Sequence, residues 1–200
     1  MEIPEDLYPI LFSLFVIIVI ALVLFFSLWR YRTIRRIMEQ QAMKHNGSVV
    51  GSFLVPVLKV SYRNLPVVVT SVPGTRYRQA KTEVNITLNK IAKADLKIVT
   101  ESLGTRLGKA FGSSDVLINS EEFDKEFLIK TPDVSFARTI LNFTLQEKLL
   151  GMKQEKPRIS LEGTWLSVAV PRVITNEERY DQLFELAFYV ADRILEPEFT

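Results

Sequence analysis

The sequence contains no cysteine and only one histidine, His45. Without cysteine the chain has no disulfide, no thiolate metal site and no cysteine nucleophile. One histidine alone cannot build the usual zinc site, and a Ser-His-Asp triad would have to use His45. That histidine lies in the polar stretch of residues 43–48, where we expect a solvated surface side chain. The composition therefore predicts a protein that has no cofactor or metal and is not an enzyme.

Glycine-rich nucleotide-binding motifs are also missing. The segment GTRLGKA at residues 104–110 is one residue short of the phosphate-loop spacing, and Ala110 replaces the magnesium-binding Ser or Thr. A group of carboxylates follows, consisting of Glu121, Glu122, Asp124 and Glu126, with Asp115 nearby. These residues lack the spacing and the glycine of a calcium loop, so we expect a solvated acidic turn. An enzyme that acts on a lipid or phosphate through Asp115 and Asp124 is an alternative function.

A long apolar run occupies the start of the chain. Sixteen of the twenty residues from Ile10 to Trp29 are Ile, Leu, Val or Phe, and only Ser13 and Ser27 are polar. As a helix this run is about 30 Å long, which matches the hydrocarbon thickness of a bilayer. Tyr8 and Trp29 bracket it, as aromatic residues do at membrane interfaces. We therefore predict one transmembrane helix within residues 1–29, rather than a core helix or a cleaved signal peptide.

The charges on either side of this run indicate its orientation. Three acids and no base precede Ile10, whereas four arginines follow Trp29 closely. These arginines are Arg30, Arg32, Arg35 and Arg36. Because Lys and Arg are retained on the cytoplasmic side, we expect the N-terminus outside and the rest of the chain inside. The predicted location is the cell membrane, with a single pass and a cytoplasmic C-terminal domain.

The basic segment of residues 30–47 is predicted to form an amphipathic juxtamembrane helix. Tyr31, Ile34, Met38 and Ala42 recur on one side of it, and Asn46-Gly47 favours a C-terminal end. Its four arginines, together with Trp29, are candidate contacts to anionic lipid headgroups or to a partner. The alternatives are that they only determine topology, or that the apolar stripe packs on another membrane protein.

Residues 48–200 have the pattern of one soluble α+β domain. Strands are predicted from alternating and β-branched runs at residues 57–61, 67–71, 83–88, 96–100 and 127–131. Residues 158–170 predict a hairpin that turns at Glu162-Gly163. Helices are predicted at residues 101–111, at 134–152, and from an Asn176 cap to Leu195. This order indicates a mainly antiparallel sheet packed by helices, with Phe143 and Trp165 in the core.

A second basic cluster lies between two predicted strands and consists of Arg76, Arg78 and Lys81 around Tyr77. Its cationic side chains are candidate contacts to lipid phosphates or to an acidic partner. From Val50 onward the chain has 20 bases and 19 acids, so the domain lacks the broad basic surface of a nucleic-acid-binding protein. We therefore expect no nucleic-acid partner.

The part of the chain from Lys81 to Leu195 resembles a known family. The resemblance rests on EEFDKEFLIK at residues 121–130, on Thr131-Pro132-Asp133, and on a helix that ends at Leu149-Leu150-Gly151. This pattern is similar to bacterial membrane-anchored domains of unknown function, which carry a phe-asp-x-x-phe segment before a strand, a helix and a hairpin. The resemblance implies a fold and a membrane-anchored topology, but no activity and no catalytic residues.

These features favour a non-enzymatic interaction module that one helix holds at the cytoplasmic face. There it would bind or stabilise a membrane protein complex, so the expected partners are the lipid bilayer and a membrane protein. The alternative is an accessory subunit of an energy-converting or transport complex that docks through its transmembrane helix.

Overall fold

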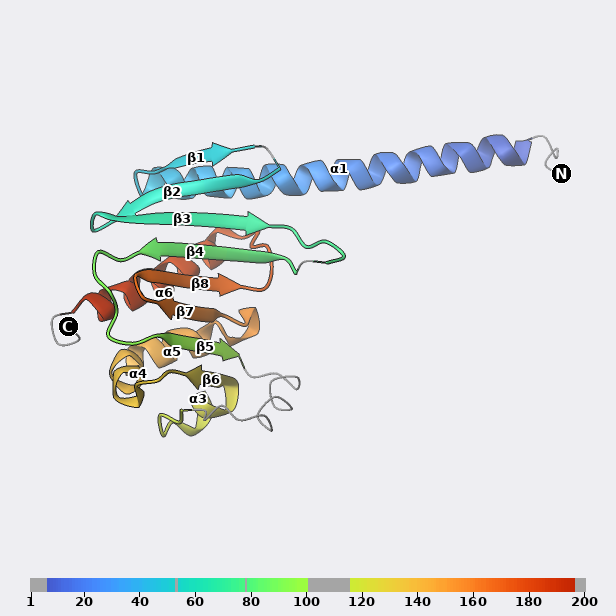
Figure 1. The fold of residues 1–200 in the computed structure, drawn as a ribbon. Coiled ribbons are helices and arrows are strands. Elements are labelled where there is room, and N and C mark those ends of the chain that lie inside the picture. The colour runs from blue at the N-terminus through green and yellow to red at the C-terminus, as the bar shows by residue number, and fades with distance from the viewer. Residues whose placement is uncertain (1–6, 53, 78, 101–115, 197–200) are drawn as a thin grey trace.

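A single sheet of eight strands forms the middle of the domain, and one long helix, α1 (Leu7–Lys44), leaves it at one end (Figure 1). The computed structural model describes residues 7–52, 54–77, 79–100 and 116–196. The strands are β1 (Ser48–Gly51), β2 (Pro56–Tyr62), β3 (Leu65–Val72), β4 (Lys81–Thr87), β5 (Leu96–Thr100), β6 (Phe127–Lys130), β7 (Arg158–Glu162) and β8 (Trp165–Val170). The other described helices are α3 (Glu121–Glu126), α4 (Val134–Ile140), α5 (Phe143–Gly151), the short η2 (Lys153–Glu155) and α6 (Glu177–Leu195).

Neighbouring strands of the sheet all pair antiparallel, in the order β1-β2-β3-β4-β8-β7-β5-β6. The β7–β8 hairpin lies between β4 and β5, so that Val84 of β4 is opposite Val168 of β8. Helices lie between some of these strands along the chain, but none of them connects two parallel neighbouring strands. The prediction of an α+β domain with a mainly antiparallel sheet is confirmed.

One face of the sheet is packed by helices, and the other face is open. On β4 the side chains of Thr82, Val84 and Ile86 are buried, whereas Glu83 and Asn85 between them are partly exposed. Helices α4, α5 and α6 and the C-terminal part of α1 lie behind the strands in Figure 1 and cover the buried face. Within the described residues no helix covers the open face. An antiparallel sheet tolerates this because alternate side chains can be polar.

The C-terminal part of α1 belongs to the hydrophobic core of the domain. Ile34, Ile37, Met38 and Ala42 are buried, and this part of the helix packs on β1 and β2. The apolar stripe of the juxtamembrane segment is therefore covered by the sheet of the same chain. The alternative that Ile34, Met38 and Ala42 pack on another membrane protein is wrong. The predicted boundaries at residues 29 and 47, which separate the transmembrane helix, the juxtamembrane helix and the domain, stay a prediction.

The end of α1 is as predicted. Asn46 adopts a positive φ of 50°, and the backbone N–H of Gly47 donates to the carbonyl of Ala42 at 2.7 Å. A Cβ atom at Gly47 would lie 2.4 Å from the carbonyl oxygen of Lys59 on β2. Glycine is required there because the turn lies directly against the neighbouring strand.

The C-terminal half of the chain differs from its predicted elements in two places. The single helix predicted over residues 134–152 is two helices, because Leu141 leaves helical geometry and the Asn142 side chain accepts from the Leu145 N–H at 3.0 Å to begin α5. The acidic segment predicted as a turn is helix α3. The β7–β8 hairpin and the Asn176 cap of α6 are confirmed. The helix predicted over residues 101–111 lies outside the described residues.

Phe143 and Trp165 are not core residues, and their predicted placement is wrong. Phe143 is 73% exposed because it follows the Asn142 cap on the outer side of α5. Trp165 is 47% exposed because it begins β8 opposite Glu162, on the open face of the sheet. Both side chains are apolar by type, but the face on which each lies depends on the helix start and the strand register.

Candidate membrane-facing site

One end of the sheet faces the N-terminal part of α1. After the turn at residues 45–47, β1 runs back along α1 toward its N-terminus (Figure 1). Antiparallel pairing then places the β1–β2 turn (residues 52–55), the β3–β4 loop (residues 73–80) and the β8–α6 connection at this same end. We call it the proximal end, and we call the end with the β2–β3 and β4–β5 connections the distal end.

The N-terminal part of α1 is the one described helix that is long and apolar enough to cross a membrane. Its apolar window has a mean hydropathy of 3.1, and none of it is buried in the domain. Large apolar side chains are exposed along it from Leu11 to Trp29. An apolar surface of this length is stable in lipid rather than in water.

Arg30, Arg32, Arg35 and Arg36, which we call the basic collar, lie between this apolar part and the core. Arg30, Arg32 and Arg36 are exposed, and the described residues give them no acidic partner. Arg35 is different, because its guanidinium pairs with Glu39 one helical turn away at 2.9 Å. Trp29 is exposed immediately before the collar. Three of the four predicted arginines are thus free to meet lipid headgroups.

The second basic cluster is split by the structure. Arg76 lies in the β3–β4 loop with its guanidinium 5.9 Å from the ring centre of Tyr77, which is 91% exposed. Lys81 instead lies at the start of β4 and pairs with Glu83 at 2.5 Å. Partial burial favours a higher pKa for Glu83, but the bonds from Lys81 and Ser167 outweigh it and hold that pKa below its ordinary value. Arg78 lies outside the described residues. Among the described members of the cluster, Arg76 therefore lies at the proximal end without an acidic partner, whereas Lys81 has one.

Exposed apolar residues accompany Arg76 at the proximal end. Leu54 and Val55 of the β1–β2 turn are both about half exposed. Neither residue was among the predicted contacts, although an uncharged run at residues 53–55 stands between the two strands. That run was the available signal, since exposed turns are usually polar. Leu54, Val55, Arg76 and Tyr77, together with Trp29 and the collar, form the candidate site.

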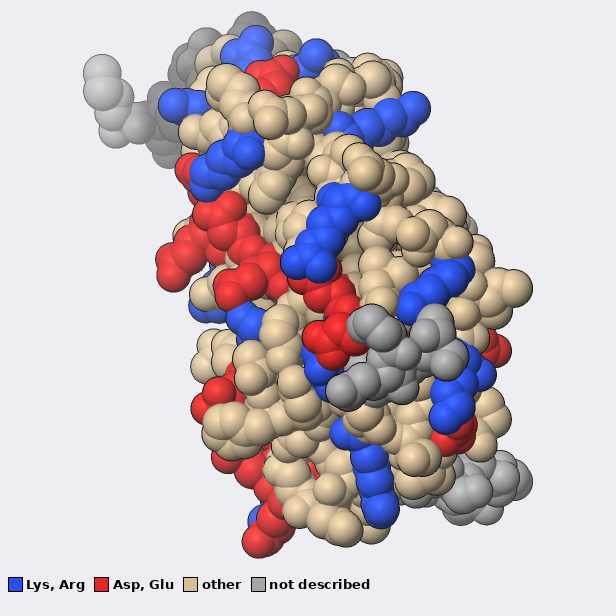
Figure 2. Space-filling view, turned by 90° about the vertical axis from the view of Figure 1, so that its left-hand side faces the viewer, with Lys and Arg blue, Asp and Glu red and all other residues tan. Residues whose placement is uncertain are grey.

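The distal end has a different surface. Figure 2 views the molecule from that side and shows acidic and basic side chains interspersed over it. Distal ion pairs include Arg63 with Asp192 at 3.1 Å. By contrast, residues 52–55 and 73–80 contain no Asp or Glu. The β1–β2 turn and the β3–β4 loop therefore differ in charge from the distal end, and these two segments suit an anionic surface.

Polar contacts hold α1 to α6. The amide nitrogen of Gln41 donates to Asp181 at 2.7 Å, and Lys44 pairs with Asp181 at 3.0 Å and with Glu177 at 2.6 Å. Partial burial favours a higher pKa for Asp181, but the bonds from Gln41 and Lys44 dominate and lower it. Bonds to Glu177 and Asp181 raise the pKa of Lys44. Both charged forms are thus favoured at neutral pH, and they fix the helix on the domain.

His45 is part of the same contact and is only partly exposed, which corrects the prediction of a solvated surface side chain. Its ring lies 4.8 Å from the ring of Phe184 and 5.6 Å from that of Phe188, both on α6. Burial lowers the pKa of His45 below its ordinary value of 6.5, and although the charge of Asp181 opposes this, that of Lys44 adds to it. The neutral ring is therefore the form that packs against the phenylalanines.

Stability should consequently depend on the protonation of His45. Because its pKa is lower in the folded state, the unfolded chain takes up the proton first as the pH falls. The contribution of His45 to stability is present above about pH 6.5 and decreases below it. His45→Gln should remove this dependence between pH 7 and 5, which denaturant unfolding at several pH values measures. An unchanged slope in the variant would contradict the prediction, and the NMR titration of the single histidine would report its pKa directly.

The acidic segment at residues 121–126 has structural contacts. Asp124 accepts from the backbone N–H groups of Ile118 and Ser120 at 3.2 Å each. Glu121 pairs with Lys125, and Lys153 lies within 4 Å of Glu122 and Glu126. Asp115 lies outside the described residues. Among the residues that the structure describes, no group of three or more His, Asp or Glu side chains is arranged to hold a metal.

The phe-asp-x-x-phe segment has a role in folding. Phe123 and Phe127 are both buried, and their rings stack with centres 4.7 Å apart. Asp124 between them fixes the preceding turn through its two backbone contacts. The motif therefore joins α3 to β6 and supplies core side chains, which explains its pattern without a catalytic role.

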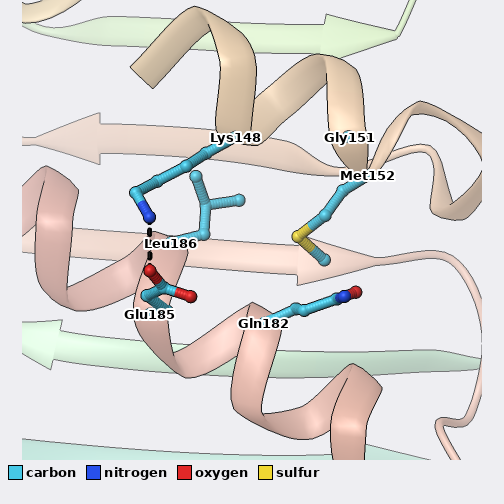
Figure 3. A pocket seen from close by; sticks show the side chains of 6 residues that line it. All are labelled: Lys148, Gly151, Met152, Gln182, Glu185 and Leu186. Carbon is cyan, nitrogen blue, oxygen red and sulfur yellow. Dashed lines mark hydrogen bonds and ion pairs between the residues drawn. The ribbon is translucent and has the colours of Figure 1, made fainter. Parts of the chain in front are cut away.

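A shallow pocket of about 180 Å³ lies between α5 and α6 (Figure 3). It is lined by Lys148, Gly151, Met152, Gln182, Glu185 and Leu186. Lys148 and Glu185 point toward one another across it and form an ion pair. Pockets that enclose a small molecule usually have volumes of roughly 300–1,000 Å³, so we assign no ligand to this one.

Comparison with known proteins shows that the chain is similar in fold to a solved structure. No family model matches the chain, and no curated protein matches it. Among solved structures it is similar to the crystal structure of the mycobacterial trehalose monomycolate transport factor A, TtfA. The TM-score is 0.57 at 13% sequence identity, and the match covers 82% of this chain and 96% of that chain. At this identity the likeness shows a shared fold alone.

Proposed function

We propose that the chain is a single-pass membrane protein whose domain is a non-enzymatic interaction module at the cytoplasmic face, where it binds or stabilises a membrane protein complex. The observation that carries this proposal is the continuity of α1, whose apolar part is exposed while its last turns are buried under β1 and β2. A domain held by a flexible linker would rotate freely. Here the sheet is fixed to the helix, so the domain and the helix move as one body.

The cytoplasmic side is proposed from the distribution of charge. Arg30, Arg32 and Arg36 are exposed next to the apolar part of α1, whereas the residues before that part carry only acids. Exposed arginines at one end of a span are retained on the cytoplasmic side. Cell membrane and cytoplasmic domain are both part of this proposal.

The open face of the sheet is the surface that we propose for the partner. Its outward positions near the centre include the uncharged Val68, Thr70, Asn85 and Ala169, on three adjacent strands. Glu83 lies between Thr70 and Ala169, and its charge is paired with Lys81. The strands run along α1, which packs on the opposite, buried face, so the open face is upright relative to the membrane rather than facing away from it (Figure 1). A partner that is itself embedded in the membrane could therefore lie along this face.

The second candidate is an accessory subunit of an energy-converting or transport complex that docks through its transmembrane helix. The shared fold with a protein named as a transport factor favours it, although that likeness supplies no partner. Kinship with the membrane-anchored domains of unknown function belongs to the same proposal. An enzyme acting on a lipid or phosphate is the third candidate, and the contacts of Asp124 give it no support.

Purification of the full chain in mild detergent would separate these candidates. In one variant an unrelated transmembrane helix of equal length replaces residues 10–29, which leaves the buried turns of α1 intact. In another, Thr70→Arg places a long cation on the open face, and Thr144→Arg places the same cation on exposed α5 as a matched control. The proposal expects a stoichiometric complex that survives the helix exchange and Thr144→Arg but is lost with Thr70→Arg. Loss on helix exchange alone would support docking through the span, and a chain that purifies without a partner would contradict both.

A further inference from the structure

We infer that the domain rests on the surface of the bilayer that α1 crosses, through the β1–β2 turn and the β3–β4 loop. Leu54, Val55 and Tyr77 enter the headgroup region, and Arg76 contacts a lipid phosphate. This inference rests on the proposed membrane span, but not on any protein partner. Two observations support it. Both segments extend along α1 as far as its apolar part, and their side chains suit a membrane interface.

The β1–β2 turn reaches the level at which α1 leaves the lipid. From Trp29 to Lys44 the helix rises by about 22 Å. From Gly47 to the tip of the β1–β2 turn the chain returns along it by up to about 20 Å, since Gly51 pairs with Pro56 and each residue of a strand advances by about 3.3 Å. The turn that carries Leu54 and Val55 therefore lies near the level of Trp29, the predicted interfacial residue.

The β3–β4 loop projects further. Val57 of β2 is opposite Thr70 of β3, so Val55 in the β1–β2 turn corresponds in height to Val72. Val72 pairs with Lys81, and residues 73–80 extend beyond this last pair toward the N-terminal part of α1 (Figure 1). Arg76 and Tyr77 lie at the tip, where the chain turns. The tip is thus beyond the level of Trp29, within reach of headgroups and the first acyl carbons.

The side chains at these positions fit that environment. Tyrosine is favoured at membrane interfaces because its ring is apolar and its hydroxyl is hydrated. Arg76 lies beside the Tyr77 ring and carries a guanidinium that can bond to phosphate oxygens. Leu54 and Val55 are aliphatic and exposed, which costs free energy in water but not at the acyl boundary. Because neither segment contains an acid, no repulsion from anionic lipid opposes the contact.

The contact would fix the orientation of the domain. A single helix can tilt and rotate in a bilayer, and flanking interfacial residues set both motions. Two further points of contact, displaced sideways from α1 by the width of the intervening strands, restrict the tilt of the helix and domain relative to the membrane. The open face of the sheet is thereby held upright at a constant angle to the membrane.

The absence of cysteine makes the test direct, because one introduced cysteine takes a nitroxide label at a single place. The full chain is reconstituted in vesicles of phosphatidylcholine and phosphatidylglycerol with the label at Leu54→Cys, Tyr77→Cys or Ile91→Cys. Ile91 is the control, since it is 76% exposed in the distal β4–β5 connection. At each label we compare collisions with oxygen, which concentrates in lipid, and collisions with an aqueous nickel complex. We expect the ratio of oxygen to nickel collisions to be several-fold higher at Leu54 and Tyr77 than at Ile91. Equal accessibility of all three labels to the nickel complex would overturn it.

A charge variant tests the phosphate contact separately. Arg76→Glu, with the label at Leu54→Cys, should raise accessibility to the nickel complex in the anionic vesicles, because the new carboxylate is repelled. In vesicles of phosphatidylcholine alone the same variant should change accessibility less. If Arg76→Glu has no effect in anionic vesicles, the assignment of Arg76 to a lipid phosphate is wrong. Because no protein partner is present, either result is independent of the complex proposed above.

Discussion

Replacing Met38 with alanine should lower the free energy of unfolding of the domain by about 2–5 kcal/mol. Met38 is 0% exposed on α1, and its side chain packs with the core that covers β1 and β2. Removing it leaves a cavity between a helix and a sheet that are each held by other contacts, so the site cannot close fully. If this part of α1 were an exposed basic helix instead, the same replacement would leave the free energy of unfolding almost unchanged.

Met43→Ala is the matched control for this substitution. Met43 lies on the same helix and is 74% exposed, so its replacement should change stability by less than about 0.5 kcal/mol. Denaturant unfolding of the full chain in detergent micelles, followed by circular dichroism, measures both variants. Equal effects of the two replacements would show that the end of α1 is not part of the folded domain.

Shortening the chain should have the larger consequence. A chain that begins at Arg30 retains the buried part of α1 and should be folded and soluble without detergent. A chain that begins at Ser48 loses Ile34, Ile37 and Met38 from the core and uncovers the inner faces of β1 and β2. At about 1.5–3 kcal/mol for each buried side chain, the loss is roughly 5–9 kcal/mol. Domains of this size have a total stability of about 5–15 kcal/mol, so we expect the shorter chain to aggregate or unfold.

Size-exclusion chromatography and circular dichroism distinguish the two chains. The chain from Arg30 should elute as a compact species with a cooperative thermal transition, whereas the chain from Ser48 should elute in the void volume or lack the transition. A stable, monomeric chain from Ser48 would contradict the assignment of α1 to the core. It would also weaken the proposed function, because the domain would then not be fixed to its helix.

Most of the secondary structure could be predicted because its signals are local. The strand over residues 96–100 and the start of α6 after Asn176 are as predicted, since alternation and a capping side chain act within a few residues. The break between α4 and α5 was missed because the apolar spacing continues through Leu141 and Asn142. There the capping bond of Asn142 competes with a continuous helix, and sequence spacing does not show which one is more stable.

The candidate site was predicted only in part, for a related reason. Arg76 and Tyr77 were singled out by their charge and ring, but Leu54 was not, because its importance comes from its height beside Trp29. Lys81 was placed with Arg76 by proximity in sequence, whereas the β4 ladder and Glu83 hold it away from the loop tip. Membership of the site is thus decided by strand register.

The sequence by itself determined the apolar helix, the basic residues after it and the α+β class, because each depends on composition or on a short period. Only the tertiary structure decided that the last turns of α1 are inside the domain, and that His45 packs on Phe184 rather than facing water. The first outcome requires contacts of α1 with the strands β1 and β2, and the second requires a contact with α6, which lies more than a hundred residues further along the chain. Such contacts depend on which faces become buried together when the chain folds, and a local pattern carries no information about that pairing.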